Sequence, residues 1–295
     1  MSARHIRRCA AAVALLLATA PLPAWQWPVP VVDLSMTFGQ DAGGYLLRGV
    51  EIGGGAQPVH PVEAGVVIAS HAEVSDVPSG LGSYVVVEHE QAFRSIYAHL
   101  DATFLPEVGR RVDVDSEIGI VGESGQVSGR ALRLYIVDLE TGAFVNPMLL
   151  LPDLTDDTRP TIGAVFARSG DSLYDLRRTT SLPPGRYELT VEVWDRLVPA
   201  SGAPRLAPHS LRMFAGGQEA FYVAMDRIAV TPQASRAEPG GLAADDLYGV
   251  EGLVRLGTVV VGSGSTEIEL VALDFAGNET SVRLSIAGQA NEDVQ

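Results

Sequence analysis

The 295-residue sequence contains no lysine, so its 21 strongly basic residues are all arginines. The acidic residues number 36, and the formal net charge is −15. A chain with this excess of negative charge repels the phosphates of nucleic acids and the anionic headgroups of membrane lipids. We therefore exclude nucleic acid and anionic membrane surfaces as primary partners.

Cysteine is almost absent, because Cys9 is the one example in the chain. It begins an apolar run, Cys9–Ala20, which follows a positively charged segment that contains Arg7 and Arg8. The run is too short to span a bilayer and is typical of a secretory signal. We predict that residues 1–24 are a signal peptide, cleaved after Ala20 or Ala24; the alternative is an uncleaved N-terminal anchor.

Long hydrophobic runs are also missing from the rest of the chain. After cleavage the net charge would be about −18, and no cysteine would remain for a disulfide or for thiol chemistry. We therefore predict an exported protein without a transmembrane segment in its mature form. Its expected location is the periplasm or another part of the cell envelope.

The apolar residues that are present occur in short runs separated by glycine and proline. Four examples between residues 35 and 147 are 65–69, 84–88, 118–121 and 134–137, and all are rich in β-branched residues. Runs of this length and composition favour strands over helices. The sequence therefore predicts an all-β protein.

A polar segment with prolines at 152 and 160 divides the chain, and a second β pattern follows it. Residues 187–195 and 265–275 alternate between apolar and polar, as half-buried strands do, and 281–286 continue that pattern. We predict a first domain over 25–150 and an immunoglobulin-like β-sandwich over 160–290, each able to fold alone. Residues 232–246, rich in Pro, Ala, Gly and Asp, are expected to form a loop.

Six short motifs in the first domain resemble, in order, those of the lysostaphin-type (LytM-type) zinc peptidases, which cut peptide crosslinks in bacterial cell walls. They are Phe38-Gly39, Gly49-Val50-Glu51-Ile52, the segment 58–67 (PVHPVEAGVV), Tyr97-Ala98-His99-Leu100, the segment 121–125 (VGESG) and Val145-Asn146-Pro147. The resemblance covers residues 35–150 and implies a β-sheet, barrel-like peptidase domain.

The resemblance also implies a zinc site, but this chain departs from it. The family binds zinc through a His and an Asp of one motif and the second His of a His-x-His motif. The matching positions here are Leu47, Glu51 and Arg133. The first His of His-x-His, a catalytic auxiliary, is replaced by Ala131, whereas the other auxiliary histidine is retained as His99. We therefore expect no catalytic residue set, no zinc and no other cofactor.

The substitutions suggest a new role for the old metal position. An arginine can replace the charge of a cation and bind a carboxylate, so we expect Arg133 to pair with Glu51; the alternative is that Arg133 faces solvent. His99 is expected either to form hydrogen bonds in the inherited groove or to pack. The groove candidates are Glu51, His60, Tyr97, His99, Arg133 and Tyr135.

Functionally, the sequence predicts an inactive LytM-type protein of the cell envelope. It would bind peptidoglycan or an envelope protein such as a cell-wall hydrolase, which it would regulate. One alternative is an active zinc endopeptidase with a non-standard ligand set, for example His60, His99 and Glu51. Another is an envelope scaffold with no affinity in the groove.

Overall fold

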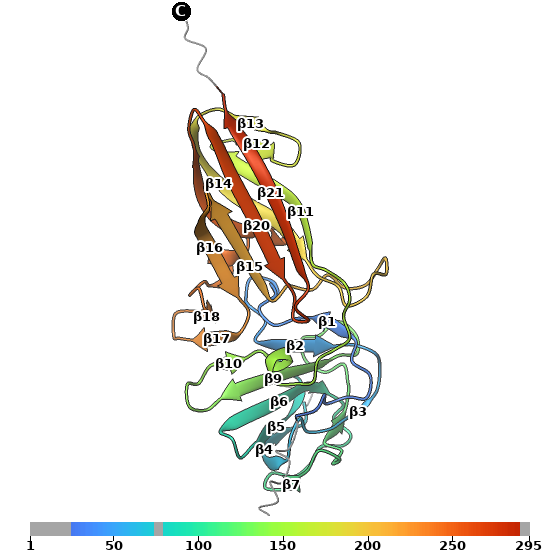
Figure 1. Ribbon diagram of the computed structural model, residues 1–295. Helices are drawn as coiled ribbons and strands as arrows, with labels where there is room; N and C mark the ends of the chain where they lie inside the picture. The colour runs from blue at the N-terminus through green and yellow to red at the C-terminus, as the bar shows by residue number, and fades with distance from the viewer. Residues whose placement is uncertain (1–24, 74–78, 290–295) are drawn as a thin grey trace, which may run out of the picture.

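The computed structural model describes residues 25–73 and 79–289, and Figure 1 shows their fold. The predicted signal peptide, residues 1–24, and the last residues, 290–295, lie outside the described part. The described chain forms two lobes, one above the other in the view of Figure 1, and the regular elements of both are almost all strands. The predicted all-β class is therefore confirmed.

The first lobe is a twisted antiparallel sheet with small additions. Its elements are β1 (Leu34–Met36), β2 (Gly49–Ile52), β3 (Pro58–Val59), β4 (Gly65–His71), β5 (Ser83–Glu88), β6 (Phe93–Leu100), β7 (Arg111–Val112), β8 (Gly119–Ile120), β9 (Leu132–Asp138), β10 (Phe144–Val145) and the 3-10 helix η1 (Pro147–Leu149). The sheet order runs β10-β9-β6-β5-β4-β7, and β2 shares an edge of β9 with β10. Of the four short runs identified in the sequence, three lie within β4, β5 and β9, and the fourth, 118–121, contains β8.

The second lobe is a sandwich of two sheets. Its elements are β11 (Thr161–Ser169), β12 (Ser172–Asp175), β13 (Ser181–Leu182), β14 (Gly185–Trp194), β15 (Ser210–Ala215), β16 (Gln218–Ala224), β17 (Arg227–Val230), β18 (Ser235–Glu238), α1 (Ala244–Leu247), the 3-10 helix η2 (Val250–Gly252), β19 (Val254–Val261), β20 (Ser265–Leu273) and β21 (Glu279–Gly288). One sheet has the order β12-β11-β14-β19, and the other β13-β21-β20-β15-β16. The alternating segments of the sequence are β14, β20 and β21, as predicted. The immunoglobulin-like identity of the sandwich stays a prediction.

Each lobe has its own apolar core, but the two are not separate structures. The hairpin β17–β18 comes from the second half of the chain, and β17 pairs with β10, so it extends the sheet of the first lobe. In the opposite direction, Phe38 and Leu46 of the first lobe are buried in the core of the second. A hydrogen bond of 2.9 Å from the Tyr248 hydroxyl to the Gly39 carbonyl crosses the same junction.

This junction differs from one expectation. Residues 232–246 were expected to form a loop, yet they contain β18 and most of α1. The pattern that marks an exposed loop, many small and polar residues, also occurs in a short edge hairpin, and this explains the difference. The predicted domain bounds, 25–150 and 160–290, and the ability of each part to fold alone stay predictions; in the structure, β17 of the second part pairs with β10 of the first.

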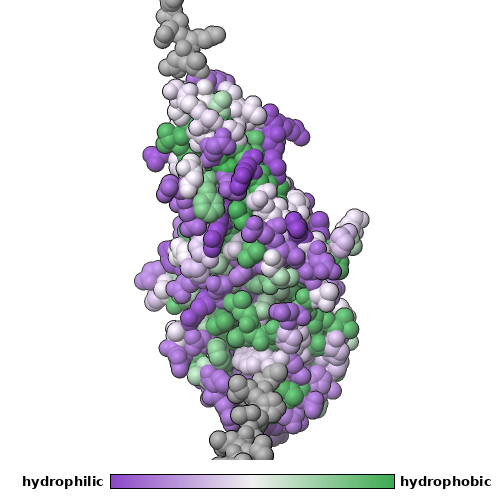
Figure 2. All heavy atoms as spheres, viewed as in Figure 1, coloured by the Kyte–Doolittle hydropathy of each residue, from purple (hydrophilic) through white to green (hydrophobic). Residues whose placement is uncertain are grey.

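The space-filling view shows the lobes in contact at the waist, with hydrophobic residues exposed on the first lobe close to it (Figure 2). Within the described part of the chain, no helix is long and apolar enough to cross a bilayer.

Candidate functional site

Three adjacent strands position the residues that the sequence singles out. β2 pairs with β9 so that Glu51 lies opposite Arg133, and β6 pairs with the other edge of β9, where Ala98 lies opposite Arg133. His99 is the next residue of β6. A Cβ atom on Gly49 would lie 2.1 Å from the carbonyl oxygen of Leu134, so glycine is required where β2 approaches β9.

Arg133 and Glu51 form an ion pair through Nη2 and Oε2, as predicted from their positions. Their side chains are only 10% and 13% exposed. The other carboxylate oxygen of Glu51 accepts a hydrogen bond of 2.9 Å from Ser35 on β1. Burial lowers the pKa of Arg133, but the hydrogen bond and the charge of Glu51 more than offset this, so the pKa is raised. The arginine therefore remains charged and neutralises the buried carboxylate.

His99 is fully buried and holds an unusual backbone conformation, with φ of 66°. Non-glycine residues adopt this left-handed region rarely, and such conformations gather at functional sites. Its Nδ1 lies 2.8 Å from the carbonyl oxygen of Ser124 and must carry a proton to make that bond. Burial lowers the pKa of His99, so the ring is neutral at pH 7 and its Nε2 is an acceptor. This Nε2 has no hydrogen-bond partner in the described structure.

The remaining family positions cannot hold a metal. Leu47 and Ala131 are apolar and buried, with 1% and 4% of their surfaces exposed. Glu51 is already occupied by Arg133. Among the described residues, His60, His99 and Glu51 do not bring ligand atoms together at metal-binding distance, because the single group that does so consists of other residues. The residues present therefore do not fit the zinc site of the family.

The other groove candidates have different surroundings. Tyr135 is half-buried beside Arg133 and packs edge-on against Phe144 at 6.1 Å. Tyr97 is fully buried, and its hydroxyl accepts hydrogen bonds from the backbone of Val62 and from Ser95. Tyr97 is therefore a core residue rather than a groove residue. The side chain of His60 is half-buried, and its Nδ1 has no hydrogen-bond partner in the described structure.

An open depression lies beside His99. It is lined by Glu73, Ser79, Gly80, Glu123, Ser124, Gly125 and Gln126. Ser124 connects this depression to His99, because its carbonyl oxygen accepts a hydrogen bond from the ring of His99. Its hydroxyl donates to the carbonyl oxygen of Leu100 at 2.7 Å. The carboxylate of Glu73 accepts hydrogen bonds from the backbone N–H groups of Ser79 and Gly125. It therefore links the two segments, around 79–80 and 123–126, that line the depression. The motif 121–125, identified in the sequence, contributes residues to this depression, whereas no sequence pattern pointed to Glu73.

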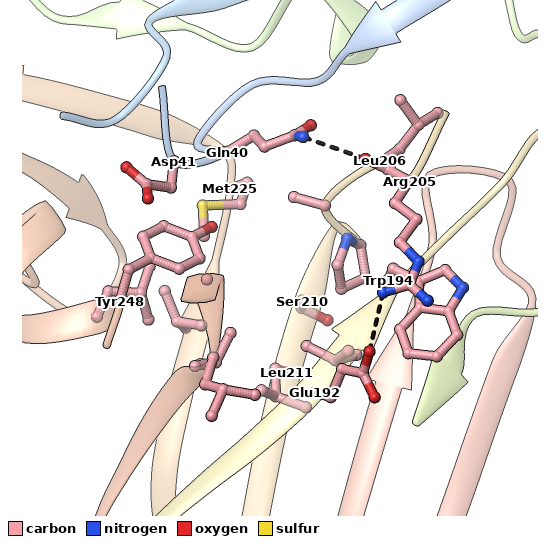
Figure 3. A pocket seen from close by; sticks show the side chains of 18 of the residues that line it. Gln40, Asp41, Glu192, Trp194, Arg205, Leu206, Ser210, Leu211, Met225 and Tyr248 are labelled. Atoms are coloured by element: carbon pink, nitrogen blue, oxygen red, sulfur yellow. Dashed lines mark hydrogen bonds and ion pairs between the residues drawn. The ribbon is translucent and has the colours of Figure 1, made fainter. Parts of the chain in front are cut away.

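A second pocket, of about 480 Å³, lies at the junction of the lobes (Figure 3). Trp194 and Arg205 form one wall, with the guanidinium 4.0 Å from the ring centroid, and Tyr248 stands on the opposite side. Arg205 also pairs with Glu192 at 2.8 Å. The charged groups of this wall are thus satisfied by one another, and the pocket interior is mainly apolar.

Comparisons with known proteins agree with the motifs of the first lobe. Residues 46–147 match the sequence model of peptidase family M23. The first lobe is therefore an M23-type (LytM-type) peptidase domain. A second family model matches residues 159–287.

Among curated proteins, the chain resembles the murein hydrolase activator NlpD. The protein of Salmonella dublin is 31% identical over 136 residues, which are 45% of this chain and 33% of that protein. The protein of Escherichia coli K12 is 30% identical over 134 residues, which are 45% and 32% of the two chains. The chain thus spans about a third of the length of these relatives.

Solved structures that are similar to part of the chain have low sequence identity to it. The catalytic domain of lysostaphin from Staphylococcus simulans is 18% identical, with a TM-score of 0.35, and the match covers 40% of this chain and 90% of that one. A chain of the SpoIIQ–SpoIIIAH pore-forming complex is 19% identical, with a TM-score of 0.37, and the match covers 44% and 91%.

Proposed function

We propose that this protein is an exported envelope protein whose M23-type domain regulates a cell-wall hydrolase without cleaving peptidoglycan itself. The single observation that carries the proposal is the Glu51–Arg133 pair at the position of the family's zinc ligands. An arginine there supplies the positive charge but offers no open coordination site for a water molecule, and activated water is what a zinc peptidase uses as its nucleophile.

The depression beside His99 is the surface that we assign to the partner. It lies beside His99, which contacts its lining residue Ser124, and it presents the exposed side chains of Glu123 and Gln126. The resemblance to NlpD, a murein hydrolase activator, supports a hydrolase as the partner. The alternative ligand is peptidoglycan, bound in the same depression. Its binding would depend on the same side chains.

A dye-release assay on labelled murein tests the proposal. The purified protein alone, supplied with zinc, is expected to release no dye, and elemental analysis after dialysis is expected to find well under one zinc per chain. Added to the purified murein hydrolases of its own organism, it is expected to raise the dye release of at least one of them severalfold. A sedimentation assay with murein sacculi measures direct binding to peptidoglycan.

Two variants locate the effect. Glu123→Arg is expected to abolish the activation, whereas Glu107→Arg, also exposed but outside the depression, is expected to leave it unchanged. Binding to sacculi without activation of any hydrolase would replace the regulatory role with peptidoglycan binding.

The rival function is an active zinc endopeptidase with a non-standard ligand set. Dye release by the protein alone, together with one chelator-sensitive zinc per chain, would establish the rival.

A further inference from the structure

Three aspartates from distant parts of the chain meet where the inter-lobe segment reaches the sandwich. Asp195 follows β14 directly, Asp274 follows β20 directly, and Asp156 lies in the segment between the lobes. One carboxylate oxygen of each lies within 4.8 Å of the others. Because β14 and β20 belong to different sheets, the cluster joins both layers of the sandwich to the connecting segment.

The negative charges of this cluster have no counter-charge. Asp195 and Asp274 are 4% and 1% exposed, and Asp156 is half-buried. None of the ion pairs found within residues 25–73 and 79–289 includes any of the three. The Oδ1 atom of Asp195 is buried and has no hydrogen-bond partner there. A buried carboxylate oxygen without a partner is strongly unfavourable, so Asp195 requires a cation or a proton at this position.

The surrounding groups hold the carboxylates in place. Asn278 donates from its backbone to Oδ1 of Asp274 at 2.7 Å and from its side chain to Oδ2 at 2.9 Å. The same side-chain amide donates to the carbonyl oxygens of Asp156 and Thr158 at 3.0 and 3.2 Å. The backbone of Thr158 donates to Asp156 at 2.8 Å. Asn278 therefore links the connecting segment to the turn after β20. These bonds hold the carboxylate oxygens of the cluster close together without a ligand.

We propose that Asp156, Asp195 and Asp274 bind a calcium ion. All the ligand atoms are oxygens of carboxylates, which hard divalent cations prefer, and no histidine or cysteine takes part, which disfavours zinc. Three oxygens that lie within 4.8 Å of one another can share a calcium ion, whose bonds of about 2.4 Å tolerate an irregular geometry, whereas magnesium demands a near-ideal octahedron and gives up its water reluctantly. The half-buried Asp156 leaves a path for the ion, and a small cavity bordered by Trp27, Asp156 and Asp195 adjoins the site.

The bound ion would have a mechanical role. It would link the connecting segment to the ends of one strand in each sheet, and so fix the second lobe relative to the first. Calcium sites of extracellular modules reach dissociation constants on the order of 10⁻⁴ M. Occupancy would then follow the calcium concentration outside the cytoplasm, and the sandwich would be most rigid where calcium is plentiful.

Calorimetric titration of the purified protein with calcium tests the proposal. We expect one ion per chain, and 10 mM calcium should raise the melting temperature by about 5 °C or more over the value in chelator. Magnesium at the same concentration should give a smaller shift. Terbium, which replaces calcium, should gain luminescence on excitation of tryptophan, because Trp27 and Trp194 lie next to the aspartates.

Matched variants separate this site from adventitious binding. Asp195→Asn and, as a milder change at the half-buried position, Asp156→Asn are each expected to remove the calcium shift and the terbium signal. Asp157→Asn, a neighbouring exposed aspartate outside the cluster, is expected to keep both. The proposal is overturned if the wild-type protein shows no calcium shift, or if the shift survives Asp195→Asn and Asp156→Asn alike; the cluster would then be neutralised by protons.

Discussion

Glu51 and Asp195 are both carboxylates largely removed from solvent, and they differ in what faces them. Glu51 has the guanidinium of Arg133 on one oxygen and the hydroxyl of Ser35 on the other. Asp195 faces two further carboxylates, and one of its oxygens has no partner in the described structure. Both sites are built from strands, at the centre of one sheet in the first case and at strand ends in the second.

The difference shows two ways in which a protein can hold a buried negative charge. Within the chain, an arginine supplies a permanent positive charge, and the site then has no need of an ion. Without such a residue, the charge must be cancelled by a bound cation or by a proton. Burial and the neighbouring carboxylates Asp156 and Asp274 raise the pKa of Asp195 to about 7, so its protonation competes with calcium near neutral pH.

The largest effect is expected from breaking the first site. Arg133→Met leaves Glu51 buried without its cation, and the free energy of unfolding should fall by about 3–5 kcal/mol, which urea denaturation measures. Glu51→Gln combined with Arg133→Met should recover part of this loss, because no charge then remains. Arg94→Met is the control, since the Arg94–Glu88 pair has side chains 42% and 41% exposed and should lose at most about 1 kcal/mol. Equal losses in the two arginine variants would show that Arg133 does not neutralise a buried charge.

The second site should respond to pH in a direction fixed by its raised pKa. In chelator, folded Asp195 holds a proton below about pH 7, whereas the unfolded chain takes it up only near the ordinary value of 3.8. The free energy of unfolding should therefore rise by about 2 kcal/mol through this group between pH 8 and pH 5.5.

The buried histidines oppose this trend. Burial lowers the pKa values of His89 and His99, so their contribution falls as the pH drops below about 6.5. Wild type and Asp195→Asn both contain these histidines. The quantity to measure is therefore the difference between their free energies of unfolding across the pH range. A difference that does not change with pH would show that Asp195 is ionised in the folded protein even without a cation.

The smallest effect is expected from the hydroxyl that completes the first site. Ser35→Ala removes the 2.9 Å hydrogen bond to Glu51, and the free energy of unfolding should fall by about 1 kcal/mol. Ser265→Ala removes a hydrogen bond to the carboxylate of Glu267 on an exposed strand surface and should have almost no effect. If the two serines behave alike, burial contributes little to the Glu51 site.

Much of the first lobe could be predicted from the sequence because its motifs are local. The pairing of Glu51 with Arg133 followed from their motif positions, which lie on adjacent strands in register. The alternation of residues 187–195 and 265–275 likewise fixes the inward and outward faces of β14 and β20. Tyr97 was misplaced because a motif gives a position along a strand, whereas the pleat alone decides which face a side chain occupies.

The remaining features depend on contacts between distant segments. Asp195 and Asp274 stand in the segments Val-Trp-Asp and Ala-Leu-Asp, which indicate strands but not that the two strand ends meet. Asp156 belongs to a polar segment that resembles any linker. The pairing of β17 with β10 joins short strands far apart in the chain, and neither carries a periodic pattern long enough to predict its partner.

That pairing has a consequence for the order in which the molecule is completed. Protein chains are synthesised from the N-terminus, so the M23-type domain exists for a time before residues 227–238 follow it. During that interval the outer edge of β10 has unpaired backbone groups, which are prone to pair with other chains. When the hairpin β17–β18 has been synthesised, β17 pairs with this edge of β10. The sheet of the first lobe is therefore complete only after much of the second lobe has been synthesised. A chain that ends before residue 227 therefore exposes the unpaired backbone groups of β10, which chaperones and proteases can recognise.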